Sequence, residues 1–234
     1  MLVELNLDAG NIISEDVHRV GILALGSHLE NHGPALPIDT DAKIASYVAL
    51  EAALRTGARF LGVLYAATEF PYVKHGIHMA RDELVERELK PVLRKARRLL
   101  NLDAAVIVNG HGGNNLEDCM EDLGDELGLE IAWNNRIVEI EGPHAGSGEL
   151  SAGIILGIAD LRRLDECRPE LYPEIGMIGL REAREANREI DRAARICERE
   201  GVNPDPVLGQ RILDDAIESV MADVKDLLEI IVEI

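Results

Sequence analysis

The sequence lacks an excess of basic residues, and this absence argues against partners that are strongly anionic. Its 234 residues include 24 Lys and Arg against 43 Asp and Glu, which gives a formal net charge of −19. Proteins that bind nucleic acid need clustered cations against the phosphate backbone, and no such cluster stands out here. We therefore expect no nucleic-acid partner, and we interpret the acidic excess as a solubilising surface.

Long apolar runs and paired cysteines are also missing. No hydrophobic stretch approaches the roughly 20 residues that span a membrane, and the opening MLVELNLD carries acids where a signal peptide has bases. The three cysteines, Cys119, Cys167 and Cys197, are too widely spaced for a Cys-x-x-Cys zinc or redox motif. We expect a soluble cytoplasmic protein with ordinary unpaired thiols and no membrane partner.

The sequence does contain short apolar runs that alternate with helical patterns, and its 47% hydrophobic content suffices for a full core. Four runs indicate buried strands, at residues 20–25, 60–65, 104–108 and 131–133. Helical patterns precede the last three of these strands, at residues 41–55, 81–100 and 115–127. Such strands are typical of parallel sheets covered by helices on both faces. We predict a three-layer α/β/α fold with a mainly parallel sheet, in one domain over residues 1–234.

The pattern changes after about residue 149. Residues 180–199 and 208–228 have the periodicity of long helices with one polar face. The only strand-like run in this part is the terminal Ile230, Ile231 and Val232. We see no internal repeat, linker or low-complexity segment.

Two polar clusters follow the first and third predicted strands. Glu30, His32 and Asp41 lie in one loop, and His111 lies in the glycine-rich turn NGHGGN. The carboxyl ends of parallel strands meet at one edge of a sheet, so the clusters should lie together. Glu30 and His32 are two apart in an extended segment and point the same way, while Asp41 starts the next helix and can bridge two cations through its two oxygens. We predict a metal centre with these four ligands.

A third segment, GPHAGSGE, adds His144 and Glu149 at the start of another helix. Glu149 could complete the coordination of a second ion, and His144 could carry the proton that a leaving amine requires. Alternatively, the two residues mark only a capped helix start with a solvent-facing imidazole. Imidazole and carboxylate ligands suit Zn, Fe(II) or Mn without choosing among them, and such a site activates water for attack on a carbonyl carbon.

Two other interpretations of these clusters stay open. The glycine-rich turn could hold a phosphate, although it lacks both the spacing of a dinucleotide fingerprint and the Lys of a P-loop. The cluster could also belong to a non-catalytic metal-binding subunit that uses its fold as an assembly platform. Metal-independent binding of nucleotide in the presence of chelator would favour the first of these.

The run ENHGPALPIDTD, the turn NGHGGN and the segment HAGSGE together resemble the creatininase family of metal-dependent amidohydrolases. In that family the first run supplies a Glu, a His and a bridging Asp, which match Glu30, His32 and Asp41, and the turn supplies a His, which matches His111. The resemblance implies a creatininase-like fold, two divalent ions per subunit and a homo-oligomer. The two long C-terminal helices could supply the interface.

Three departures from the family pattern bear on the substrate. Creatininase itself has a glutamate ligand two residues after the histidine of the turn, where this chain has Gly113, and most relatives have a second histidine where it has Ala35. The segment YVKHGIH, residues 72–78, also replaces a Pro-Gly-Thr stretch that many members share. Creatinine is therefore not the expected substrate.

Within the family, the runs GSHLENHGPALPIDTDAK and YVKHGIH are similar to those of the archaeal deformylases of flavin and F420 biosynthesis. This subfamily removes formate from 2-amino-5-formylamino-6-ribosylaminopyrimidin-4(3H)-one 5'-monophosphate and is associated with Fe(II). The substrate phosphate needs a cationic partner, for which we predict Lys74 with His75 or His78, unless these are ordinary residues of an exposed loop. The alternative is an amidohydrolase that acts on another small or cyclic amide.

Overall fold

The computed structural model describes residues 12–233 and places a four-stranded sheet at its centre, in the order β2-β1-β3-β4. The strands are β1 (Val20–Leu25), β2 (Arg59–Leu64), β3 (Ala104–Asn109) and β4 (Glu130–Asn134). All three neighbouring pairs are parallel. The predicted parallel sheet is confirmed, and each predicted strand lies within one residue of its observed bounds.

The two central strands are buried at every position, which explains why they contain no polar side chain before Asn109, the last residue of β3. Alternate residues of β1 enter different cores: Val20, Ile22 and Ala24 pack into one, and Leu23 and Leu25 into the other. A strand covered on both faces gains nothing from polar residues on either face. The sheet is therefore the middle of three layers.

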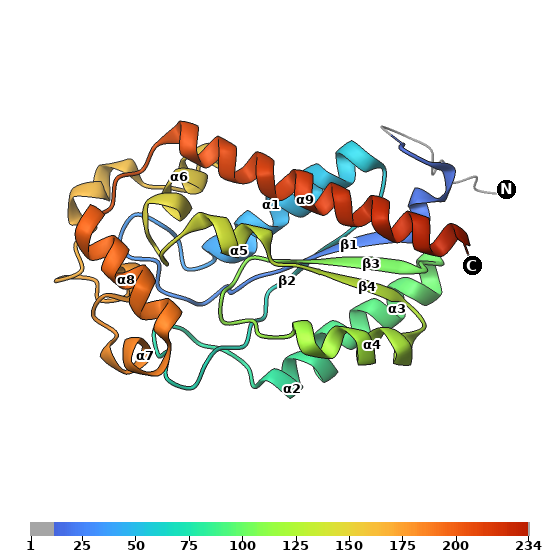
Figure 1. Ribbon diagram of the computed structural model, residues 1–234, viewed down its shortest axis with the longest axis horizontal. Coiled ribbons are helices and arrows are strands. Elements are labelled where there is room, and N and C mark those ends of the chain that lie inside the picture. The colour runs from blue at the N-terminus through green and yellow to red at the C-terminus, as the bar shows by residue number, and fades with distance from the viewer. Residues whose placement is uncertain (1–11, 234) are drawn as a thin grey trace, which may run out of the picture.

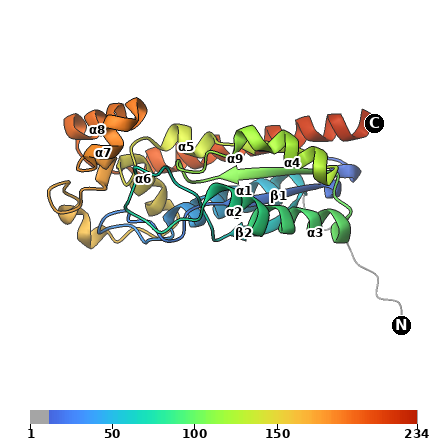
Figure 2. The ribbon, with the colours of Figure 1, turned by 90° about the horizontal axis from the view of Figure 1, so that it is seen from below.

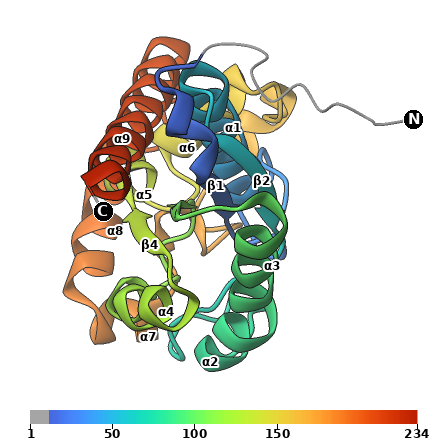
Figure 3. The same cartoon turned by 90° about the vertical axis from the view of Figure 1, so that its right-hand side faces the viewer.

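Helices cover both faces of the sheet (Figures 1 and 3). One core receives the apolar faces of α1 (Thr40–Thr56), α5 (Arg136–Glu141), α6 (Ser147–Ile155) and α9 (Pro206–Glu233). The other core lies under α2 (Arg81–Leu84), η2 (Val85–Leu89), α3 (Lys90–Leu100), η3 (Glu117–Cys119) and α4 (Met120–Leu127). The predicted three-layer α/β/α fold is confirmed.

The remaining elements are short. η1 (Glu15–Arg19) precedes β1, and η4 (Leu161–Glu166) and η5 (Ile175–Met177) follow α6. α7 (Arg181–Ala186) and α8 (Arg188–Glu200) lie at the end of the molecule opposite the C-terminus (Figures 1 and 2). None of the helices within residues 12–233 is long and apolar enough to cross a bilayer.

Two predictions for the C-terminal part are wrong. The helix predicted over residues 180–199 is broken at Asn187, whose backbone is extended (φ −131°, ψ 115°) and whose side chain accepts hydrogen bonds from the amides of Glu189 and Ile190. Asn187 therefore ends α7 and caps α8. The terminal strand does not form, because Ile231 continues the apolar face of α9 and is buried in the core beneath it.

Candidate metal centre

Two loops at one edge of the sheet hold each other in place around Glu30. The amide of Asn31 donates to the carbonyl of His75 (2.9 Å), and the amide of Ile77 donates to the carbonyl of Leu29 (2.8 Å). A Cβ at Gly76 would lie 2.8 Å from the carbonyl oxygen of Leu29, so this close pairing requires glycine. The YVKHGIH segment is thus a partner of the loop that carries the first predicted ligand.

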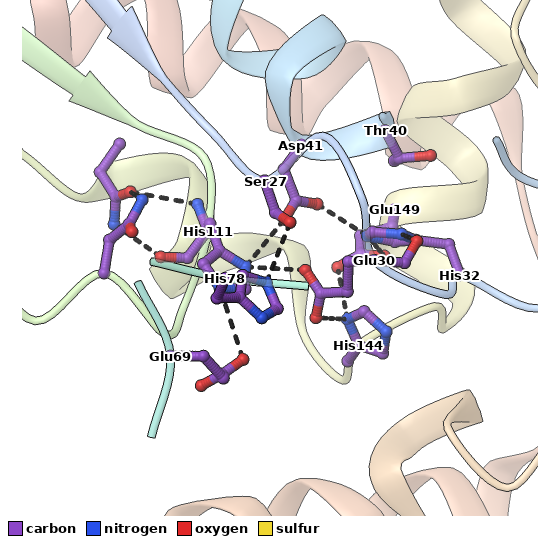
Figure 4. A network of polar contacts seen from close by, with 12 residues as sticks. Ser27, Glu30, His32, Thr40, Asp41, Glu69, His78, His111, His144 and Glu149 are labelled. Atoms are coloured by element: carbon purple, nitrogen blue, oxygen red, sulfur yellow. Dashed lines mark hydrogen bonds and ion pairs between the residues drawn. The ribbon is translucent and has the colours of Figure 1, made fainter. Parts of the chain in front are cut away.

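The structure brings together the four predicted ligands (Figure 4). Asp41 is buried in the first turn of α1, with its Oδ1 at 2.7 Å from His32 Nε2 and its Oδ2 at 2.9 Å from His111 Nδ1. The same Nδ1 atom lies 2.9 Å from Glu30 Oε2. Asp41 thus faces a different imidazole with each oxygen, which is the arrangement that a bridging carboxylate needs.

Two glycines allow the strand ends to approach Asp41 this closely. A Cβ at Gly26, directly after β1, would lie 2.6 Å from the amide nitrogen of Ala42. A Cβ at Gly110, directly after β3, would lie 2.7 Å from the carbonyl oxygen of Asp41. The start of α1 is therefore packed between the carboxyl ends of the two central strands, and the predicted clusters meet there for this reason.

The third predicted segment reaches the same place. Glu149 lies in the first turn of α6, where its Oε2 accepts from the amide of Ala145 (2.8 Å) and lies 3.8 Å from His32 Nε2. The Nδ1 atom of His144 lies 3.6 Å from Glu30 Oε1 and 3.8 Å from Glu149 Oε1. The side chain of His144 is only 10% exposed, so its imidazole faces the cluster and not solvent.

Burial and the charges of neighbouring side chains shift the pKa values of Glu30, His144 and Glu149, often in opposite directions. Burial alone would raise the pKa of Glu30, but the adjacent His111 and His144 lower it well below its ordinary value. Burial lowers the pKa of His144 to about 3, so its ring is neutral at pH 7. Burial, together with the charge of Asp41, raises the pKa of Glu149 to about 7 against the opposing effect of His32. Shifted pKa values of this kind are typical of functional sites.

The donor atoms fit a divalent cation. The Glu30 Oε2 atom is buried with His111 Nδ1 at 2.9 Å but has no hydrogen bond of good geometry among the described residues, so it is available to a cation. Several groups of three side chains in this part of the chain have potential ligand atoms that all lie within 4.8 Å of one another. Two such groups are Glu30, His32 and Asp41, and His32, His144 and Glu149. All are carboxylate oxygens or imidazole nitrogens, which bind Zn, Mn or Fe(II) without distinguishing them.

The residues predicted to bind a substrate phosphate do not gather at one place. His75 is buried with its Nε2 at 2.5 Å from Glu30 Oε1, and the ring of His78 stacks on that of His111 with centroids 5.1 Å apart. Lys74 pairs with Glu182 at the surface (3.1 Å). The two histidines thus contact metal-ligand candidates, and the assignment of Lys74 to the phosphate stays a prediction.

A cavity of about 270 Å³ opens onto the cluster and is bounded on its far side by α8. Two carboxylates in its wall were missed by sequence reasoning, Glu69 and Glu141. Burial, with the nearby charges of Glu149 and Asp41, raises the pKa of Glu141 well above its ordinary value. For Glu69 a signal existed, because it follows the strand predicted at residues 60–65, as the other candidates follow theirs. For Glu141 the sequence offers no such signal.

Binding of a divalent ion to the metal-free protein at pH 7 should release protons. Burial lowers the pKa of His32, but the charge and hydrogen bond of Asp41 outweigh it and raise the pKa to about 10, so this ring is protonated at neutral pH. A metal ion binds only the unprotonated nitrogen, so affinity should rise by about tenfold per pH unit for each proton released, until the pH passes that pKa. Calorimetry in buffers of different ionisation enthalpy measures the release. A binding heat independent of the buffer would contradict the prediction.

Comparison with known proteins agrees with this geometry. Residues 13–224 match the sequence model of the family described as Creatininase, creatinine amidohydrolase. The chain is 91% identical over 233 residues to the 2-amino-5-formylamino-6-ribosylaminopyrimidin-4(3H)-one 5'-monophosphate deformylase of Methanothermobacter thermautotrophicus, with 100% of both chains covered.

Two solved structures show the same fold at low sequence identity. One, named Creatininase Mn, has a TM-score of 0.61 and 17% identity, covering 94% of this chain and 92% of that one. The other is a mutant creatininase of Zn-Zn type, with a TM-score of 0.58 and 16% identity, covering 88% of this chain and 90% of that one. On the extent of the family match and of the 91% identity, the chain belongs to the creatininase family.

Proposed function

We propose that this protein is a metal-dependent deformylase that hydrolyses the formamide of 2-amino-5-formylamino-6-ribosylaminopyrimidin-4(3H)-one 5'-monophosphate to formate and the free 5-amine, a step of archaeal riboflavin and F420 biosynthesis. The substrate is the one named for the relative that is 91% identical over the full chain. The observation that carries the chemistry is Asp41, whose two oxygens face His32 and His111 beside Glu30 at the mouth of a cavity.

The residues of this chain would hold two ions. Glu30, Asp41 and His111 would hold one, and His32, Asp41 and Glu149 the other. A divalent ion in such a site polarises the carbonyl oxygen of an amide and lowers the pKa of water. We propose that the ion bound in the cell is Fe(II). Zn or Mn should be able to substitute for it, because the two solved creatininases are named for Mn and Zn.

His144 is the proposed carrier of the proton that the leaving amine needs. Its Nε2 lies 2.8 Å from the carbonyl oxygen of Asn31, which can only accept, so Nε2 holds the hydrogen. The free Nδ1 then faces Glu30 and Glu149 and can take a proton from the attacking water and pass it to the 5-amine.

The substrate phosphate needs a cation that the described walls of the cavity do not provide. The lining residues include six acids and no Lys or Arg: Glu30, Asp41, Glu69, Glu141, Glu149 and Glu189. We propose that Lys74, or a second copy of the chain in a homo-oligomer, supplies the positive charge that binds the phosphate.

We also propose that residues 1–234 form a single domain.

Formate release should be specific to the formylaminopyrimidine nucleotide. The purified protein is loaded anaerobically with Fe(II), Mn or Zn and incubated with this nucleotide, with creatinine and with simple formamides, and formate is measured alongside bound metal. Because the cavity holds more than a formamide group, only the nucleotide should fill it and react. Comparable turnover of the other amides would favour the alternative, an amidohydrolase of broader or different substrate. Bound metal without any turnover would favour a non-catalytic metal-binding subunit.

A further inference from the structure

Glu69 presents an unpartnered oxygen to one of the proposed metal ligands. Its side chain is 6% exposed, and its Oε1 accepts from the amide of Phe70 at 2.7 Å. Its Oε2 is buried without a hydrogen-bond partner among the described residues and lies 3.4 Å from His111 Nε2, which also lacks such a partner (Figure 4). Two buried polar atoms that lie this close, with no hydrogen bond to any other described residue, indicate a specific relationship between these side chains.

The glycine at position 113 makes room for this carboxylate. A Cβ at Gly113 would lie 2.4 Å from Glu69 Oε1 and 2.5 Å from His111 Nε2, so any side chain at position 113 would displace Glu69. The glycine in the turn and the glutamate after β2 are therefore one structural feature. An acidic group reaches the ring of His111 from the loop after β2 instead of from the turn that carries the histidine.

We propose that Glu69 is a positioning residue, which accepts the hydrogen of His111 Nε2 and thereby leaves Nδ1 free to bind the metal between Glu30 and Asp41. A metal-bound imidazole commonly donates its other N–H to a carboxylate, which fixes both the tautomer and the orientation of the ring. The stacked ring of His78 limits rotation of His111 from its face, and Glu69 limits it at the edge. The inference rests on the metal centre of the proposed function.

The test compares the metal affinity of Glu69→Ala and Glu69→Gln with that of the unaltered protein, measured by competition with a chromophoric chelator for Zn²⁺ and Mn²⁺. Loss of an acceptor behind a ligating histidine lowers metal affinity by roughly 10- to 100-fold, so we expect this loss for Glu69→Ala. Glu69→Gln keeps an acceptor oxygen in the same place and should recover most of the affinity. The absorption spectrum of the Co²⁺-loaded proteins should change in Glu69→Ala and stay close to normal in Glu69→Gln.

Glu189→Gln is the matched control, because it removes one negative charge from the wall of the same cavity on α8, a helix that carries none of the proposed ligands. It should bind metal normally. Unchanged affinity in Glu69→Ala would overturn the proposal while leaving the metal centre intact. Equal losses in Glu69→Ala and Glu69→Gln would also overturn it, since they would show that the charge of Glu69, and not its acceptor oxygen, holds the ion. Failure of the unaltered protein to bind either metal would instead refute the proposed function itself.

Discussion

Asp41→Asn should lower kcat/KM for formate release by at least about 10³-fold, or ~4 kcal/mol of transition-state stabilisation. The substitution keeps the shape of the side chain but replaces one oxygen by an amide nitrogen, which cannot bind a cation. Because each oxygen of Asp41 faces a different imidazole, the change removes a ligand atom from one proposed ion and the shared negative charge from both. Bound metal, measured by atomic emission after gel filtration, should fall together with the activity.

Asp39→Asn provides the matched control for this experiment. The change is the same and lies two residues away, but Asp39 pairs with Lys43 (2.5 Å) and is not a member of the ligand sets. Activity and bound metal should stay within about twofold of normal, because a single ion pair of this exposure contributes little. Near-normal formate release by Asp41→Asn with full folding would show that the reaction does not depend on this centre.

The fold was predictable where burial acts on both faces of a strand. In β1 and β3 every position is buried, so the apolar run in the sequence ends within one residue of the strand end. The prediction failed where a single side chain decides the backbone. Asn187 breaks the helical periodicity of residues 180–199 only because its side chain caps the next helix, and the surrounding pattern gives no sign of this.

The candidate site was predictable to the extent that its groups follow strands or lie close together in the chain. Glu30, His32, Asp41 and His111 share this property, because parallel strands end at the same edge. Glu141 does not: it ends α5, and among 43 acidic residues only its tertiary burial distinguishes it. The pairing of its loop with the loop of Glu30 turns His75 toward that carboxylate, a contact that the sequence does not indicate.

The helix that carries Glu149 is held in place by a close contact with α9, and this contact gives the largest stability prediction. Gly209→Ala should destabilise the protein by about 2 kcal/mol, although alanine favours a helix over glycine by about 1 kcal/mol. A Cβ at Gly209 would lie 2.1 Å from the carbonyl oxygen of Ser151 and 2.9 Å from the amide nitrogen of Ala152, both in the backbone of α6. Backbone atoms cannot move aside alone, so the two helices must separate. Urea unfolding measured by circular dichroism gives the change.

Gly153→Ala is the matched control for this effect, because it makes the same substitution in α6 itself. There the nearest atom to the new Cβ would be Leu36 Cδ2 at 2.6 Å, the tip of a side chain that can change rotamer. The helix propensity gained should offset the repacking, and the free energy of unfolding should stay within about 1 kcal/mol of normal. Because Glu149 moves with α6, Gly209→Ala should also bind metal more weakly than Gly153→Ala. Equal stability of the two variants would show that α6 and α9 can separate without cost.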